Sequence, residues 1–82
     1  MSRYVGGDLH RRRSQVVVLD EDGQVVSSVN VDNCEPAELV AAVAVGGEGC
    51  DVVIEAAWGW YWIADLFAAA GFVVHLAHPL GV

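Results

Sequence analysis

The sequence predicts a single small α/β domain built on one mixed β-sheet. The chain has 82 residues, which is enough for one domain with one hydrophobic core. Its composition is 55% hydrophobic and 18% charged, which excludes intrinsic disorder because apolar burial can offset the entropy cost of ordering. Short β-branched runs alternate with segments of helical periodicity, a pattern typical of α/β domains. We also expect an exposed apolar patch, since so short a chain cannot bury every large side chain.

The first half of the chain predicts a three-stranded antiparallel meander. A short strand over Tyr4–Asp8 precedes a second strand over Ser14–Leu19, whose four consecutive apolar residues indicate an inner strand, buried on both faces, rather than an edge. Asp20–Gly23 forms the next turn. In Gln24–Asp32, valines alternate with serine, asparagine and aspartate, so this segment predicts a half-exposed outer strand with its valines on one face.

A helix and a parallel strand are expected next. Pro36 suits the first turn of a helix, Asn33 or Glu35 is the candidate cap, and Gly46 lies where this helix ends. The β-branched run within Asp51–Glu55 predicts a central parallel strand that ends in a carboxylate.

The last part of the chain predicts a second helix and a final strand. Apolar residues recur at helical spacing from Trp60 to Ala70, and Gly71 stands where a left-handed C-terminal cap belongs. Phe72–Leu76 then returns as a strand that Pro79 ends. Right-handed connections would arrange this element order into a mixed sheet with flanking helices. Ribonuclease-H-like folds begin with this order of strands and helices, and the actin-like ATPase and sugar-kinase domains begin with it too.

Two carboxylates are the strongest candidates for chemistry. Asp8 and Glu55 each end an otherwise apolar strand, where an unpaired charge is expensive to desolvate. If their strands are parallel neighbours, both acids lie at the strand ends where α/β sheets bind ligands. Hard oxygen ligands there suit Mg²⁺ or Mn²⁺ and phosphodiester chemistry. The alternative is that each acid marks a strand end and faces water.

Charge is segregated along the chain. The formal net charge of −7 argues against a free-standing nucleic-acid binder, which normally carries a basic face. Three of the four arginines nevertheless stand together in the sequence, as Arg11, Arg12 and Arg13. We expect them in the loop after the first strand. There they could contact a phosphate backbone, or they could simply form a solvated turn. His10, beside them, is expected to be exposed in the same loop.

Other chemistry-bearing residues carry weaker expectations. The aromatic residues at the start of the second helix are expected to pack in the core or on an oligomer surface rather than to stack on bases; they are Trp58, Trp60, Tyr61 and Trp62. His75 and His78 lack companion ligands, so we expect no metal there. Cys34 and Cys50 are expected as reduced thiols. The chain has no long apolar segment or secretory signal, and we expect a cytoplasmic protein.

Three segments resemble one protein family. Val5–His10, Ser14–Asp20 and Val53–Leu80 are similar to the N-terminal domain of the DEDD-type insertion-sequence transposases, which include the Piv-like DNA invertases. That domain itself resembles the RuvC Holliday-junction resolvase. The resemblance covers nearly the whole chain and is most specific over Glu55–Pro79. Two positions depart from the family's pattern. Gly7 stands where the family usually has an apolar residue, and Ala57-Trp58 stands where it has a small hydroxyl residue and glycine.

The resemblance implies that residues 1–82 are the N-terminal part of a RuvC-like, ribonuclease-H-like catalytic domain, truncated before the family's last two aspartates. It assigns Asp8 as the first catalytic aspartate and Glu55 as the glutamate, both ligands of Mg²⁺ or Mn²⁺. The complete protein would cleave DNA and transfer strands in transposition, with DNA, a guide RNA and further copies of itself as partners. With half of the metal site and the C-terminal nucleophile domain missing, we expect weak metal binding and no activity from this chain alone.

Two other hypotheses stay open. One is a nucleotide-binding fragment of the actin-like or sugar-kinase class, although the bulky residues over Leu9–Arg13 do not suit a phosphate cradle. The other is a non-catalytic interaction module that dimerises through its aromatic helix.

Overall fold

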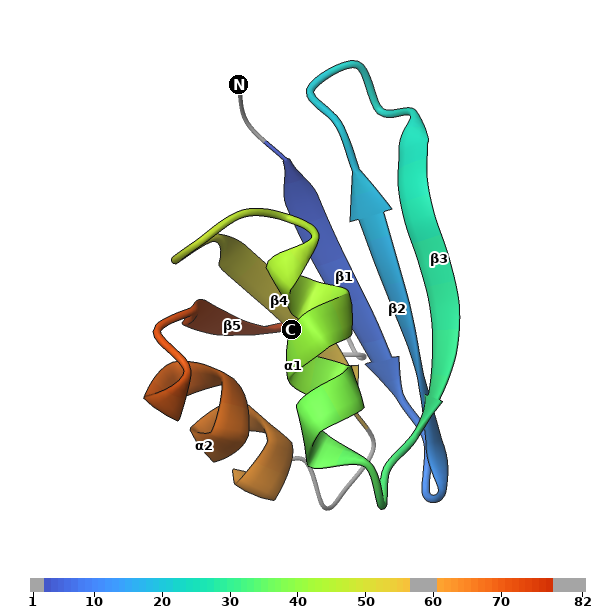
Figure 1. Ribbon diagram of the computed structural model, residues 1–82, viewed down its shortest axis with the longest axis vertical. Helices are drawn as coiled ribbons and strands as arrows, with labels where there is room; N and C mark the ends of the chain where they lie inside the picture. Colours follow the sequence, from blue (N-terminus) through green and yellow to red (C-terminus); the bar gives the residue numbers. More distant parts are fainter. Residues whose placement is uncertain (1–2, 57–60, 78–82) are drawn as a thin grey trace.

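The computed structural model describes residues 3–56 and 61–77, and it shows an α/β arrangement of one five-stranded mixed sheet and two helices (Figure 1). The predicted fold class is therefore confirmed at the level of an α/β domain with a mixed sheet. The expected element order, β-β-β-α-β-α-β, is also the one observed.

The sheet combines an antiparallel meander with three strands that are parallel to one another. Its strands are β1 (Tyr4–Leu9), β2 (Arg13–Leu19), β3 (Val25–Asp32), β4 (Asp51–Ala56) and β5 (Val73–Ala77). They lie in the order β3-β2-β1-β4-β5. β2 is antiparallel to both of its neighbours, whereas β1, β4 and β5 are parallel to one another. β1 and β4 therefore lie side by side although more than forty residues separate them along the chain.

The helices are α1 (Pro36–Ala44) and α2 (Tyr61–Ala69), and their ends follow local sequence rules. Pro36 lies in the first turn of α1, and Glu35 takes the N-cap position without a side-chain hydrogen bond. After α2, Gly71 adopts φ 97°, and the amides of Gly71 and Phe72 donate to the carbonyls of Ala68 and Phe67. This is the Schellman pattern, so the predicted glycine cap is confirmed.

Among the described residues, no helix is both long enough and apolar enough to cross a membrane.

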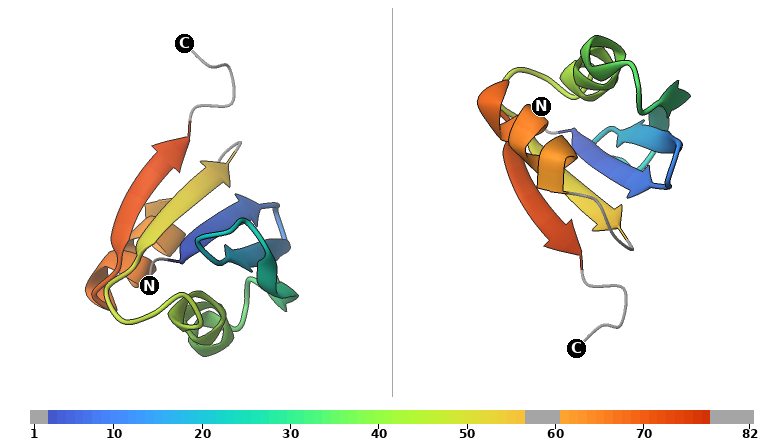
Figure 2. Two further views of the ribbon diagram at one scale, coloured as in Figure 1. Left: turned by 90° about the horizontal axis from the view of Figure 1, so that it is seen from above. Right: turned by 90° about the horizontal axis from the view of Figure 1, so that it is seen from below.

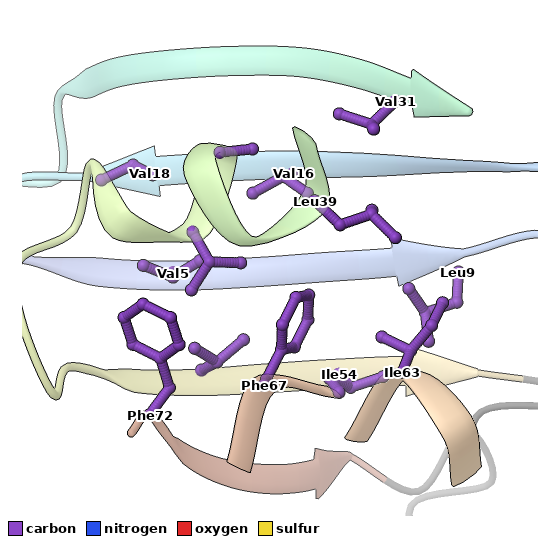
Figure 3. Close-up of a cluster of buried hydrophobic side chains, with 13 residues drawn as sticks. Val5, Leu9, Val16, Val18, Val31, Leu39, Ile54, Ile63, Phe67 and Phe72 are labelled. Atoms are coloured by element: carbon purple, nitrogen blue, oxygen red, sulfur yellow. The ribbon is translucent and has the colours of Figure 1, made fainter. Parts of the chain in front are cut away.

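Both helices cover the same face of the sheet (Figure 2). The connections β3-α1-β4 and β4-α2-β5 step in the same direction across the sheet, and right-handed connections of this kind place their helices on one side. The core fills the space between this face and the helices (Figure 3); its members are Val5, Leu9, Val16, Val18, Val31, Leu39, Ala42, Val43, Val52, Ile54, Ile63, Phe67 and Phe72.

The opposite face of the sheet is uncovered by the described part of the chain, and we call it the open face. Because side chains alternate along a strand, the apolar runs in β2 and β4 send every second residue to this face. Val17 is there only partly buried and Val53 is 44% exposed. The expectation that β2 is buried on both faces is therefore wrong for Val17, while the inner position of β2 in the sheet is confirmed.

β3 is an edge strand, as its alternating pattern predicts. Only one of its three alternating valines is buried, however: Val31 lies in the core, whereas Val25 and Val29 are exposed. The register with β2 shifts between Val18 and Leu19, which interrupts the alternation near the start of β3.

Candidate carboxylate site on the open face

Asp8 on β1 and Glu55 on β4 are direct partners across the parallel strand pair. Each is exposed and alternates with buried residues, so both side chains project from the open face. Neighbouring strands lie about 4.8 Å apart, and in-register residues on one face are therefore adjacent. The structure thus brings together the two acids that the sequence singles out.

A shallow hollow of about 250 Å³ lies beside these carboxylates. Gly6 opens it, because a Cβ atom at Gly6 would meet no atom of the described residues within 4 Å, apart from its own neighbours along the chain. The residues that line it are Gly6, Gly7, Asp8, Gln15, Val17, Val53, Glu55 and Ala77. The hollow therefore has a largely apolar floor with acidic oxygens at one end, next to the end of β1.

His10 pairs with Asp8, with 3.3 Å between His10 Nε2 and Asp8 Oδ2. Both side chains are more than half exposed, so solvent screens this interaction and it contributes little to stability. The expectation of an exposed His10 is confirmed, and its contact with Asp8 is a feature that spacing alone did not predict.

The arginine cluster lies at the same end of the sheet as the carboxylates. Arg11 and Arg12 are in the turn between β1 and β2, whereas Arg13 is the first residue of β2. The expectation that all three occupy the loop is therefore wrong for Arg13, whose backbone pairs with Asp32 on β3. All three side chains are exposed, so the local environment at this end combines cations with two carboxylates.

Asp32 and Cys34 form a small polar turn after β3. The Cys34 amide donates to Asp32 Oδ1 at 2.8 Å, and this hydrogen bond, aided by Arg13, holds the pKa of Asp32 below its usual value. A separate hydrogen bond between the Cys34 thiol and the Asp32 side chain raises the pKa of that exposed thiol, and burial raises the pKa of Cys50. Both cysteines are free, as expected, and their raised pKa values disfavour the thiolate.

Asn33 connects the arginine turn to the end of β3. Its Nδ2 donates to the carbonyl of His10 at 2.7 Å, and its backbone amide donates to the carbonyl of Arg12 at 2.7 Å. Its Oδ1 accepts from the hydroxyl of Ser14, which is fully buried. The sequence offers Asn33 only as a helix-cap candidate, but its side chain instead holds the turn that follows Asp8.

We expect Asn33→Ala to destabilise the protein by about 1–3 kcal/mol, because it leaves the buried Ser14 hydroxyl without its acceptor. Amide hydrogen exchange should also accelerate in the turn around Arg12. Urea unfolding and exchange measured by NMR check both effects. Asn30→Ala is the matched control: the hydrogen bond from the Asn30 side chain to half-buried Gln15 lies at the exposed surface, so a change of less than about 0.5 kcal/mol is expected. Equal losses in the two variants would contradict the role given to Asn33.

None of the remaining sequence candidates that the structure describes lines this hollow. His75 Nε2 lies 3.0 Å from Oδ1 of Asp51, which is at the other end of β4. Tyr61 and Trp62 are exposed on α2 and do not belong to the core of this chain. Trp58, Trp60 and His78 lie outside the described residues.

The donor chemistry at Asp8 and Glu55 suits a hard divalent cation. Carboxylate oxygens are the ligands that Mg²⁺ and Mn²⁺ prefer, and Mg²⁺ is commonly held by one or two carboxylates plus waters and substrate oxygens. Within residues 3–56 and 61–77, no group of three or more histidine, cysteine, aspartate or glutamate side chains could surround one ion. The two carboxylates therefore form a partial ligand set.

No protein-family model matches the chain, and no curated protein sequence matches it significantly.

Proposed function

We propose that this chain is the N-terminal part of the ribonuclease-H-like catalytic domain of a DEDD-type transposase. In that protein, Asp8 and Glu55 would hold the divalent ion used for DNA cleavage and strand transfer. The observation that carries the proposal is the in-register pairing of these two acids on parallel neighbouring strands, both on the open face.

The strand order supports the same proposal. A three-stranded meander followed by two parallel strands on the β1 side is the arrangement expected for the opening of a ribonuclease-H-like fold. The resemblance of Val5–His10 and of the segment around Glu55 to the transposase family adds the assignment of the two acids. The net charge of −7 opposes DNA binding by this chain alone.

Different residues of the site would have different roles in the cleavage of DNA. A divalent ion bound here would polarise the phosphodiester and stabilise the charge that develops on its oxygens. Asp8 and Glu55 would hold that ion at adjacent positions on two rigid strands. Gly6 leaves room beside them for the groups attached to the phosphate, since no side chain of residues 3–56 and 61–77 occupies that part of the hollow. Arg11 and Arg12, in the turn after Asp8, are placed to contact flanking phosphates.

Metal binding by the 82-residue chain tests this proposal directly. In ¹H–¹⁵N NMR spectra, millimolar Mn²⁺ should broaden amide resonances around Asp8 and Glu55 first. The double variant Asp8→Asn/Glu55→Gln should abolish this local broadening, because it removes both anionic ligands and keeps their size. Asp51→Asn is the matched control, as Asp51 lies on the same face at the other end of β4 and pairs with His75.

The outcome decides the assignment. Broadening that is unchanged in the double variant, or that centres on the acidic turn Asp20–Gly23, would show that the two carboxylates are not a metal site. We expect the isolated chain to leave branched DNA uncut with Mg²⁺ or Mn²⁺, since two carboxylates are an incomplete ligand set. DNA cleavage that disappears in Asp8→Ala would refute this expected inactivity.

A further inference from the structure

The outer edge of β3 is an unpaired strand edge. β3 is the first strand in the sheet order, so its only strand neighbour in the described structure is β2. Alternate N–H and C=O groups along Val25–Asp32 therefore face away from β2. Figure 1 shows this edge along one margin of the molecule, with α1 packed over the sheet rather than across the edge.

β3 lacks the features that normally protect an edge strand from pairing. Natural edges are blocked by prolines, charged side chains or very short strands. β3 has eight residues, and from Val25 to Val31 it contains no charge and no proline. Four of these seven residues are valine, a strong β-former, and Val25, Val26 and Val29 are exposed. The strand is thus suited to pairing with another extended segment.

A groove between β3 and α1 adjoins this edge. Its volume is about 360 Å³, and its apolar lining includes Val29, Val31, Ala41 and Val45. Val29 is 37% exposed in this groove, although its side chain lies on the helix-covered face of the sheet, like that of Val31. A partner that extends the sheet here would also bury this apolar surface.

The two ends of β3 differ in charge, because one adjoins a purely acidic turn and the other combines the three arginines with Asp32 and Glu35. β3 begins after a turn that holds Asp20, Glu21 and Asp22, and it ends beside the arginine turn, where Arg13 pairs with Asp32. Two copies paired in parallel would place acidic turn on acidic turn. An antiparallel pair instead places the acidic turn of each copy near the arginine cluster of the other, twice by two-fold symmetry.

We infer that a second copy of this chain pairs with β3 in antiparallel fashion, with Val29 opposite Val29 of the partner subunit. Directly opposed residues share a face of the sheet. This register therefore keeps the helices of both copies on one face and sets Ser28 opposite Asn30 on the open face. It buries the two Val29 side chains against each other and against the groove, and the two sheets become continuous. Both Asp8 and Glu55 pairs would then face the same side of the assembly.

Sedimentation tests the dimer with a matched pair of variants. The unmodified chain should sediment as a dimer at about 100 μM, and Val29→Lys should be a monomer because two opposed lysines would repel and lose the groove contact. Val53→Lys adds the same charge at a similarly exposed valine on β4, away from β3, and should remain a dimer. Circular dichroism of each variant confirms that it is folded. A monomeric unmodified chain, or a folded Val29→Lys variant that still dimerises, would overturn the inference.

Disulfide trapping tests the register and stays informative if Val29→Lys fails to fold. With Cys34→Ser and Cys50→Ala as background, Val29→Cys should form an intermolecular disulfide under mild oxidation, since opposed residues lie within bonding range. Asn30→Cys is the control, because in this register Asn30 lies opposite Ser28 and not opposite Asn30 of the partner subunit. Equal trapping at both positions, or trapping at neither, would overturn the proposed pairing.

Discussion

Phe67→Ala is expected to destabilise the domain by about 3–5 kcal/mol, the largest effect of any single substitution that we predict. Phe67 is 1% exposed and projects from α2 into the core (Figure 3). Its ring packs edge-to-face on Phe72, with centroids 6.5 Å apart and an interplanar angle of 88°. Truncation therefore removes core volume and an aromatic pair at once.

This loss is large for so small a domain. At about 0.05–0.15 kcal/mol per residue, 82 residues have about 4–12 kcal/mol of stability in all. A substantial unfolded population is thus expected for the variant at 37 °C. Urea unfolding followed by far-ultraviolet circular dichroism measures the change. Trp62→Ala removes a larger aromatic side chain from the exposed side of the same helix and should cost about 1 kcal/mol or less. If the two substitutions cost the same, α2 does not pack through Phe67.

Gly46→Ala is expected to destabilise the protein by about 1–3 kcal/mol through overpacking. A Cβ atom at this position would overlap Cγ2 of Val5 and would lie 3.0 Å from Sγ of Cys50. Val5 is a buried core residue on β1, so it cannot move aside into solvent. Gly46 is therefore required for close packing of the chain after α1 against the sheet, and not for an unusual backbone conformation, since its φ is not positive.

A control and a coupled variant make this test specific. Gly6→Ala adds the same methyl group where no atom of another described segment lies within 4 Å, and we expect it to be neutral or to stabilise slightly by restricting the unfolded chain. Removing the overlapping atoms with Val5→Ala should make Gly46→Ala less costly than it is alone, with a coupling of at least about 0.5 kcal/mol. Strictly additive free energies of unfolding would mean that Val5 and Gly46 do not interact.

Local sequence rules predict most of the helices and strands, because the residues that begin and end each of them act only on their near neighbours in the chain. Pro36 begins α1, and Gly71 ends α2 by adopting a left-handed conformation that other residues rarely adopt. The alternation in Gln24–Asp32 predicts an edge strand, since one face of such a strand meets water. Right-handed connections then restrict the topology, and β1 and β4 become parallel neighbours as expected.

The candidate site is predictable only in part, for a physical reason. A strand that ends in a carboxylate can be recognised from the sequence, so Asp8 and Glu55 could be named in advance. The contact of His10 with Asp8 and the bonds of Asn33 to Ser14 and His10 depend on how three separate segments meet. Such contacts leave no periodic pattern in the sequence. Arg13 joins β2 rather than the loop for a similar reason, because it has Asp32 as a pairing partner across the strands.

The amino-acid sequence by itself determined the element order, the α/β class and the two acids at strand ends, because periodicity, caps and β-branched runs act over a few neighbouring residues. The tertiary structure alone decided the register that places Asp8 opposite Glu55 and the covering of a single face by both helices. Apolar runs such as Val16–Val18 are compatible with burial on either face. Which face is covered depends on where the connecting helices pack, and that is a property of the whole chain.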